Sequence, residues 1–176
     1  YQPRSKKGSC IGCTAGRFTN VSAMSHCFDC QPGLAAETDF ATECVICNVG
    51  RFSKEIRSTG CTDCPRGFAS QGNSTQGISC PPCAAGFYSE LAGSQACLKC
   101  AAGKRTFLAG MWECGECPPG TASGDEKSTT CQTCQKGRYA KGFANDACTI
   151  CPSGWHASGD TNTQCQICSA GTACLP

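Results

Sequence analysis

The cysteines are the residues of this sequence whose type and spacing could do chemistry. There are 21 of them among 176 residues, more than the tenth of the composition that marks a disulfide-rich scaffold. All but Cys174 belong to Cys-x-x-Cys pairs, and the first members of these pairs are Cys10, Cys27, Cys44, Cys61, Cys80, Cys97, Cys114, Cys131, Cys148 and Cys165. Three kinds of chemistry use such pairs: structural disulfides, tetrahedral zinc sites and thiol redox catalysis.

Thiol redox and zinc fit the pattern less well than disulfides do. A redox site is a single Cys-x-x-Cys pair at a helix N-terminus in a βαβ setting, whereas these pairs are near-equivalent and lack that setting. Zinc ribbons do space their ligands similarly. A zinc array would nevertheless group the pairs two by two, while here the spacers are nearly uniform and Cys174 is left over. We therefore expect disulfides, with no metal and no cofactor.

Two disulfide connectivities respect the repeat, and the sequence leaves both open. In a crossed scheme Cys10 bonds Cys27 and Cys13 bonds Cys30, so the period is two units and Cys174 remains alone. In a sequential ladder the second cysteine of each pair bonds the first cysteine of the next, and Cys10 is left for an upstream half-unit or for another molecule. We favour the ladder, because its period is one unit and because it explains the short last loop. Its bonds are Cys13–Cys27, Cys30–Cys44, Cys47–Cys61, Cys64–Cys80, Cys83–Cys97, Cys100–Cys114, Cys117–Cys131, Cys134–Cys148, Cys151–Cys165 and Cys168–Cys174.

The segments that must position the cysteines repeat with the same period. Successive first cysteines are 17 residues apart, except from Cys61 to Cys80, where the step is 19 and the polar stretch 70–77 holds the insertion. A fixed short period is typical of stacked units that contact chiefly their neighbours. The third residue after each second cysteine is always glycine, which predicts a turn with positive φ or a close backbone approach there. These repeat glycines are Gly16, Gly33, Gly50, Gly67, Gly86, Gly103, Gly120, Gly137, Gly154 and Gly171.

The residue two positions after each repeat glycine alternates between a large aromatic and alanine over the first five units, from Phe18 to Tyr88. This alternation favours packing of a ring in one unit against the disulfide or small residue of the next.

The composition and the repeat together predict the fold class. Leu, Ile, Val and Phe make up only 22 residues, too few for a conventional core to offset the roughly 1 to 2 kcal/mol per residue that backbone ordering costs. We expect a small disulfide-rich protein, an elongated solenoid-like rod of about ten 17-residue irregular β-hairpin repeats with little or no helix. Residues 1–9 are expected to be an N-terminal tail or fragment edge, 10–168 the tandem repeats, and 169–176 a truncated terminal repeat.

Units such as Cys80–Ser89 and Cys114–Ser123 resemble the ephrin-receptor-like cysteine-rich repeat. This repeat is similar in style to the cysteine-rich modules of tumour-necrosis-factor receptors, and comparable arrays occur in large protist surface proteins, including ciliate immobilisation antigens and mastigoneme proteins. The resemblance covers Cys10 to Cys174 and implies an extracellular, elongated, disulfide-laddered rod without enzymatic activity. The sequence departs from the pattern at Lys104–Phe107, where the aromatic comes late, and in the shortened last unit.

The remaining residues favour an extracellular structural role. The net charge of +2 predicts no nucleic-acid partner, and no apolar run is long enough to span a bilayer. Two sequons, at Asn20 and Asn73, lie in the variable segments where attached glycans would be exposed. The histidines, His26 and His156, are far apart in the sequence, so we expect no catalytic site.

Two functions follow from these observations. The favoured one is a non-enzymatic structural protein, a surface, appendage or filament component that binds protein partners or assembles with itself. The alternative is the ligand-binding ectodomain of a receptor or adhesin. Met111, Trp112 and Trp155 are the candidate contact residues, because tryptophan concentrates at interface hot spots.

Overall fold

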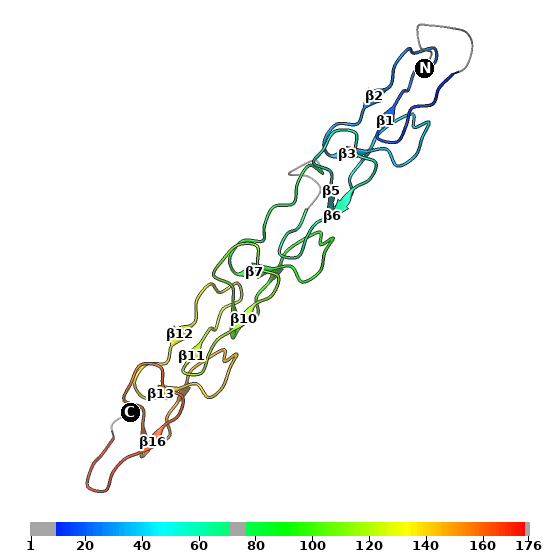
Figure 1. The fold of residues 1–176 in the computed structure, drawn as a ribbon. Coiled ribbons are helices and arrows are strands. Elements are labelled where there is room, and N and C mark those ends of the chain that lie inside the picture. Colours follow the sequence, from blue (N-terminus) through cyan, green and yellow to red (C-terminus); the bar gives the residue numbers. More distant parts are fainter. Residues whose placement is uncertain (1–9, 71–76, 175–176) are drawn as a thin grey trace. The chain divides into compact units, whose positions relative to one another are not determined.

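The computed structural model describes residues 10–70 and 77–174, and Figure 1 shows short strands joined by long irregular connections. The chain divides into two compact units, Tyr1–Pro82 with Glu90–Ala96, and Cys83–Ser89 with Cys97–Pro176. Each unit is built from the same repeat, and the described ranges contain no helix. The expected small disulfide-rich repeat fold with hairpin units is therefore confirmed.

All regular structure consists of antiparallel strand pairs, each strand being two residues long. In the first unit β1 (Arg17–Phe18) pairs with β2 (Phe28–Asp29), β3 (Leu34–Ala35) with β4 (Val45–Ile46), and β5 (Arg51–Phe52) with β6 (Thr62–Asp63). In the described part of the repeat that carries the insertion, Phe68 and Pro82 form an isolated antiparallel bridge. In the second unit the pairs are β7 (Phe87–Tyr88) with β8 (Leu98–Lys99), β9 (Lys104–Arg105) with β10 (Gly115–Glu116), β11 (Thr121–Ala122) with β12 (Gln132–Thr133), β13 (Arg138–Tyr139) with β14 (Thr149–Ile150), and β15 (Trp155–His156) with β16 (Gln166–Ile167).

The conformation of each hairpin is determined by a glycine turn at one end of the loop and by the disulfide beside that turn. In the first repeat the Arg17 N–H donates to the Thr14 carbonyl at 3.0 Å, and Gly16, with φ +82°, occupies the turn position where L-residues are strained. The two residues after the glycine then pair with the two residues after the next first cysteine, Arg17 with Asp29 and Phe18 with Phe28. All ten repeat glycines have positive φ, which confirms the predicted turns.

Ten disulfides join the hairpins, and their connectivity is the sequential ladder. Nine link a second cysteine to the first cysteine of the next pair, from Cys13–Cys27 to Cys151–Cys165, and the tenth is Cys168–Cys174. The bonded Cα atoms lie 5.6 to 6.0 Å apart, as is usual for disulfides. The crossed scheme is therefore not the one adopted, and Cys10 is an exposed free thiol.

Neighbouring repeats are joined through the residue three positions after each repeat glycine, which we call the small-residue position. In the second repeat this residue is Ala36, whose carbonyl accepts from the Gly16 N–H at 2.8 Å and whose own N–H donates to the Ser58 carbonyl at 3.1 Å. The same two bonds recur along both units. The position holds only Ala, Ser or Thr in nine repeats: Thr19, Ala36, Ser53, Ser70, Ser89, Thr106, Ser123, Ala140 and Ala157.

A second contact position, which we call the tip, lies seven residues after the repeat glycine in eight described repeats, at Ala23, Phe40, Arg57, Gly93, Gly110, Lys127, Ala144 and Thr161. The N–H of the tip residue Arg57 donates to the carbonyl of Cys30 in the preceding repeat at 2.8 Å. The carbonyl of the same residue lies against Gly16, two repeats back, where a Cβ would collide with it. The prediction that units contact chiefly their neighbours is thus incomplete, because next-but-one repeats also touch.

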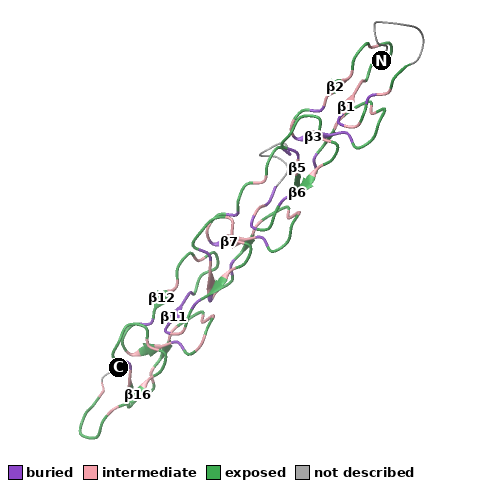
Figure 2. Cartoon of the chain, in the orientation of Figure 1, coloured by how far each residue is buried: buried purple, intermediate pink, exposed green. Residues whose placement is uncertain are grey.

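The interior contains almost no large apolar side chain. Every buried hydrophobic residue in the described ranges is a cysteine or an alanine, and Figure 2 shows the buried residues as short stretches that recur among exposed ones. At the position two residues after the repeat glycine, Ala35, Ala69 and Ala122 are buried. Phe18 is half-buried and meets Phe28 across its own hairpin, with ring centroids 5.8 Å apart. Covalent bonds, rather than a packed core, therefore hold each repeat in shape.

Candidate functional site

We call each disulfide of the ladder a rung. The two cysteines of a rung differ in their access to solvent. From Cys13 to Cys134 every second cysteine is at most 3% exposed, whereas the first cysteines with which they bond are half-buried. This asymmetry arises because each second cysteine immediately precedes the glycine turn, and its carbonyl accepts the tip N–H of the next repeat, as Cys13 does from Phe40 at 2.7 Å. These sulfurs are shielded from thiols in solution, so the inner rungs are suited to a permanent structural role.

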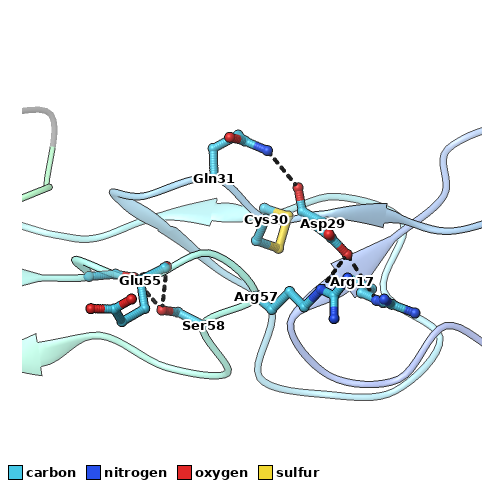
Figure 3. Close-up of a disulfide and its surroundings, with 9 residues drawn as sticks. Arg17, Asp29, Cys30, Gln31, Glu55, Arg57 and Ser58 are labelled. Carbon is cyan, nitrogen blue, oxygen red and sulfur yellow. Dashed lines mark hydrogen bonds and ion pairs between the residues drawn. A yellow bond between two sulfur atoms is a disulfide. The ribbon is translucent and has the colours of Figure 1, made fainter.

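Asp29 on β2 forms two ion pairs in the first unit. Its carboxylate accepts from Arg17 of its own hairpin and from Arg57 two repeats later, both at 2.9 Å (Figure 3). The hydrogen bond from Arg57 is the main cause that lowers the pKa of Asp29 below its ordinary value, and the charges of Arg57 and Arg17 act in the same direction against partial burial. A side-chain contact between next-but-one repeats thus accompanies the backbone contact at Gly16.

The second unit repeats this arrangement with different chemistry. Lys127, a tip residue, places its ammonium 5.6 Å from the centre of the Phe87 ring two repeats earlier. The neighbouring Glu126 lies 3.5 Å from Lys99 of that earlier repeat. The side chains that join next-but-one repeats are therefore exposed or half-buried and of varied type, while the backbone contact recurs at Gly16, Gly86, Gly103 and Gly120.

One group of potential metal or redox ligands occurs in the described part of the chain. The ligand atoms of His156, Cys168 and Cys174 all lie within 4.8 Å of one another. Cys168 and Cys174 are bonded to each other, and the Nδ1 of His156 is buried without a hydrogen-bond partner among the described groups. The sequence analysis expected no metal site and did not bring these three residues together. The repeat pattern alone does not show that His156 lies beside the loop closed by Cys168 and Cys174.

The other histidine has no comparable surroundings. His26 packs edge-on against Phe28, with ring centroids 4.8 Å apart, and it is exposed.

Large apolar side chains are on the surface instead of in the interior. Among the described residues eighteen are exposed, including Trp112 at 46% and Trp155 at 44%. Of the predicted contact residues, Met111 is half-buried, and Trp155 lines a cavity of about 300 Å³ together with His156 and Cys174.

The first predicted glycan site lies where attachment is sterically open. Asn20, Val21 and Ser22 are all exposed at the start of the bend that leads to the tip residue Ala23. The second sequon, at Asn73, lies outside the described residues.

The architecture of the chain comes from its own sequence and structure. No protein-family model matches it, and no curated protein matches it. The chain is a cysteine-rich repeat array. No described residue belongs to a long apolar helix that could cross a membrane.

Sequence reasoning missed the small-residue position and the tip. The small-residue position was visible as an unbroken run of Ala, Ser and Thr at a fixed offset from the glycines. A sequence signal for the left-handed backbone at the tip exists only at Gly93 and Gly110, which are glycines. The other described tips also have positive φ but hold other residues: Ala23, Phe40, Arg57, Lys127, Ala144 and Thr161. Residues of such varied type give no signal of a left-handed backbone.

Proposed function

We propose that this protein is a non-enzymatic extracellular structural protein, a surface, appendage or filament component that acts as a disulfide-laddered rod. The observation that carries the proposal is the interior, in which the buried hydrophobic residues are cysteine and alanine alone. A chain built in this way depends on its crosslinks for stability, at about 3 kcal/mol for each loop of roughly 15 residues. Its surface is then free to carry apolar and charged residues that a globular fold would place inside.

An oxidising compartment supports the same proposal. Disulfides persist outside the cell and in the secretory pathway, and are rare in the cytosol. The exposed sequon at Asn20 is consistent with passage through that pathway and with an attached glycan. The resemblance of its units to ephrin-receptor-like and tumour-necrosis-factor-receptor-like repeats, which occur in extracellular proteins, points to the same setting.

Small-angle scattering of the secreted protein, together with non-reducing peptide mapping, tests this function. Mapping should recover the sequential bonds, beginning with Cys13–Cys27. Scattering should give a pair-distance distribution with a long tail, and a radius of gyration well above the roughly 16 Å of a compact domain of this length. A compact particle, or alkylatable thiols throughout the chain, would refute the proposal.

A ligand-binding ectodomain is the second candidate, and the exposed apolar residues favour it. Replacing Trp112 and Trp155 by serine should abolish either self-assembly or capture of a ligand, whereas Phe143, which is 66% exposed, offers a matched control for general stickiness. Polymerisation of the purified protein that rises with concentration and is lost only in the tryptophan variants supports the structural role. A protein that stays monomeric and binds a second protein through these tryptophans supports the receptor role.

A further inference from the structure

One loop in the middle of the second unit is apolar along its whole length. Residues 107–112, which we call the apolar loop, have the sequence Phe-Leu-Ala-Gly-Met-Trp and lie between β9 and β10. Phe107 is 60% exposed, Leu108 55% and Trp112 46%, whereas Met111 is half-buried. In the other repeats with a complete loop, the corresponding residues include at least three polar side chains. The surface of the array therefore changes character at this loop.

Backbone hydrogen bonds hold the middle of the apolar loop against the preceding repeat. The Gly110 N–H donates to the Cys83 carbonyl at 2.8 Å, and the Met111 carbonyl accepts from the Ser89 N–H at 3.3 Å. A loop held in this way loses little conformational entropy when its exposed side chains meet a partner. The exposed apolar residues are thus presented in a fixed arrangement.

The exposed area of the apolar loop is too small for a stable protein interface. Three half-exposed side chains of this size offer on the order of 300 Å², less than half of the roughly 800 Å² that each partner buries in such an interface. A lipid surface sets no comparable minimum, because binding strength there scales with the apolar area that enters the boundary between headgroups and acyl chains.

The residue types of the apolar loop match that boundary. Tryptophan is enriched at membrane–water interfaces, and Trp, Phe and Leu form the lipid-facing side of segments that lie in the interface. The loop has no helix or strand, so some of its N–H and C=O groups must keep contact with water. It can therefore enter a bilayer to the depth of the headgroups and upper acyl chains, but no deeper.

A cation lies at the base of the apolar loop, where lipid phosphates would be. The Arg105 guanidinium lies 5.3 Å from the centre of the Phe107 ring, and its neighbour across the hairpin is Gly115, which has no side chain. The adjacent Lys104 is paired with Glu116 at 3.3 Å. With Phe107 below the headgroups, Arg105 would be level with the phosphates, which a guanidinium binds through two parallel hydrogen bonds.

We propose that the apolar loop inserts into the interfacial layer of a phosphatidylcholine bilayer, with Phe107, Leu108 and Trp112 among the upper acyl chains and Arg105 at the phosphates. Because Glu113, which is exposed beside Trp112, offsets the charge of Arg105, the attachment depends on apolar insertion and not on anionic lipids. This inference rests on the proposed role as a surface component and names the surface that the component contacts.

Flotation of the intact, disulfide-bonded protein with phosphatidylcholine vesicles in high salt tests the inference, since salt screens attraction between exposed charges. The wild type should float with the vesicles. Leu108→Ser should weaken binding on the order of tenfold, and a variant with serine at 107, 108 and 112 should not float. Phe143→Ser removes a ring that is 66% exposed from a loop with charged neighbours and should bind like the wild type. Recovery of the Cys100–Cys114 peptide shows that the hairpin has closed in each variant.

Fluorescence locates the contact, because the chain has only two tryptophans. In Trp155→Phe the emission comes from Trp112, and vesicles should shift it to shorter wavelength and protect it from a quencher dissolved in water. In Trp112→Phe the emission comes from Trp155, and vesicles should leave it unchanged.

The inference is overturned if the wild type does not float, or if Phe143→Ser weakens binding as much as Leu108→Ser does. Self-association or protein capture that depends on the apolar loop in the absence of lipid would overturn it too, because the loop would then be a protein contact. Each of these results leaves the proposed rod standing. A compact particle in scattering has the reverse meaning, because it refutes the rod whether or not vesicles bind.

Discussion

The contact between next-but-one repeats can be isolated by comparing two glycines with the same backbone conformation. Gly103 and Gly137 have φ of +80° and +76°, and both donate their N–H to the small-residue position of the next repeat, Ser123 and Ala157. A Cβ added at Gly103 would meet the carbonyl of Ala144, with its carbon at 2.6 Å and its Cα at 3.2 Å. A Cβ at Gly137 meets no described atom within 4 Å.

The two alanine variants should therefore differ by the cost of that collision alone. Forcing alanine into a left-handed conformation costs about 1 to 2 kcal/mol at either position. At Gly103 the backbone of the Ala144 tip must also move, which costs about 1 to 3 kcal/mol by analogy with overpacked cores. It also strains the hydrogen bond from the Ala144 N–H to the Cys117 carbonyl, 2.9 Å long.

Hydrogen exchange is the appropriate assay, because it reports the local opening of a single tip, which a measurement of global unfolding would average with the rest of the chain. The Ala144 amide should exchange roughly 5- to 150-fold faster in Gly103→Ala than in Gly137→Ala, which corresponds to 1 to 3 kcal/mol. Mass spectrometry must first show that all ten disulfides have formed in both variants. Equal exchange in the two variants would refute the view that next-but-one repeats stabilise each other.

Three further changes test other features. Ser123→Ala should stabilise its unit by about 1 kcal/mol, because the buried Oγ of Ser123 has no partner among described groups. Ser53→Ala, which removes a hydrogen bond to Ser58, should instead lower the melting temperature. Shifts of the same sign in the two variants would contradict this. Asp29→Asn should lower the melting temperature at neutral pH. Because the pKa of Asp29 is lowered in the folded protein, its contribution to stability is complete above the ordinary pKa of about 3.9 and disappears as the pH falls through the folded pKa. The melting temperatures of wild type and variant should therefore converge in acid. A constant difference in melting temperature down to pH 2 would argue against the ion pairs. Asn20→Gln, expressed in a secreting eukaryotic cell, should lose the mass of one N-linked glycan, and an unchanged mass would show that the sequon is not used.

The covalent frame could be predicted from the sequence because cysteine spacing restricts it directly. A 17-residue period with one glycine at a fixed offset leaves only two regular disulfide schemes, and the short Cys168–Cys174 loop favours the one that the structure has. Short hairpins without helix follow from the same spacing, since a closed loop of this length with a glycine turn has room for little else.

The contacts between repeats could not be predicted, because they depend on how each repeat is rotated relative to the last. That rotation brings Arg57 to Asp29 and Lys127 to Phe87, and the spacing of cysteines carries no information about it. The cluster around His156 was missed for the same reason. The cluster exists because His156, two residues after Gly154, lies beside the small-residue position of the next repeat. In the last repeat this position holds Cys174, whereas in the other repeats it holds Ala, Ser or Thr.

The order of the disulfides also determines how the chain would carry tension. Along the shortest covalent path, force crosses from Cys13 to Cys27 through their disulfide, a Cα separation of 5.7 Å, and then follows only the three residues to Cys30. Each repeat can therefore lengthen to roughly 17 Å at most, against about 60 Å for 17 residues pulled straight. The hairpin loops with their tips lie off this path, whereas the second strand of each hairpin, such as Phe28–Asp29 between Cys27 and Cys30, lies on it. Pulling single molecules before and after reduction should show the maximum extension increase more than threefold.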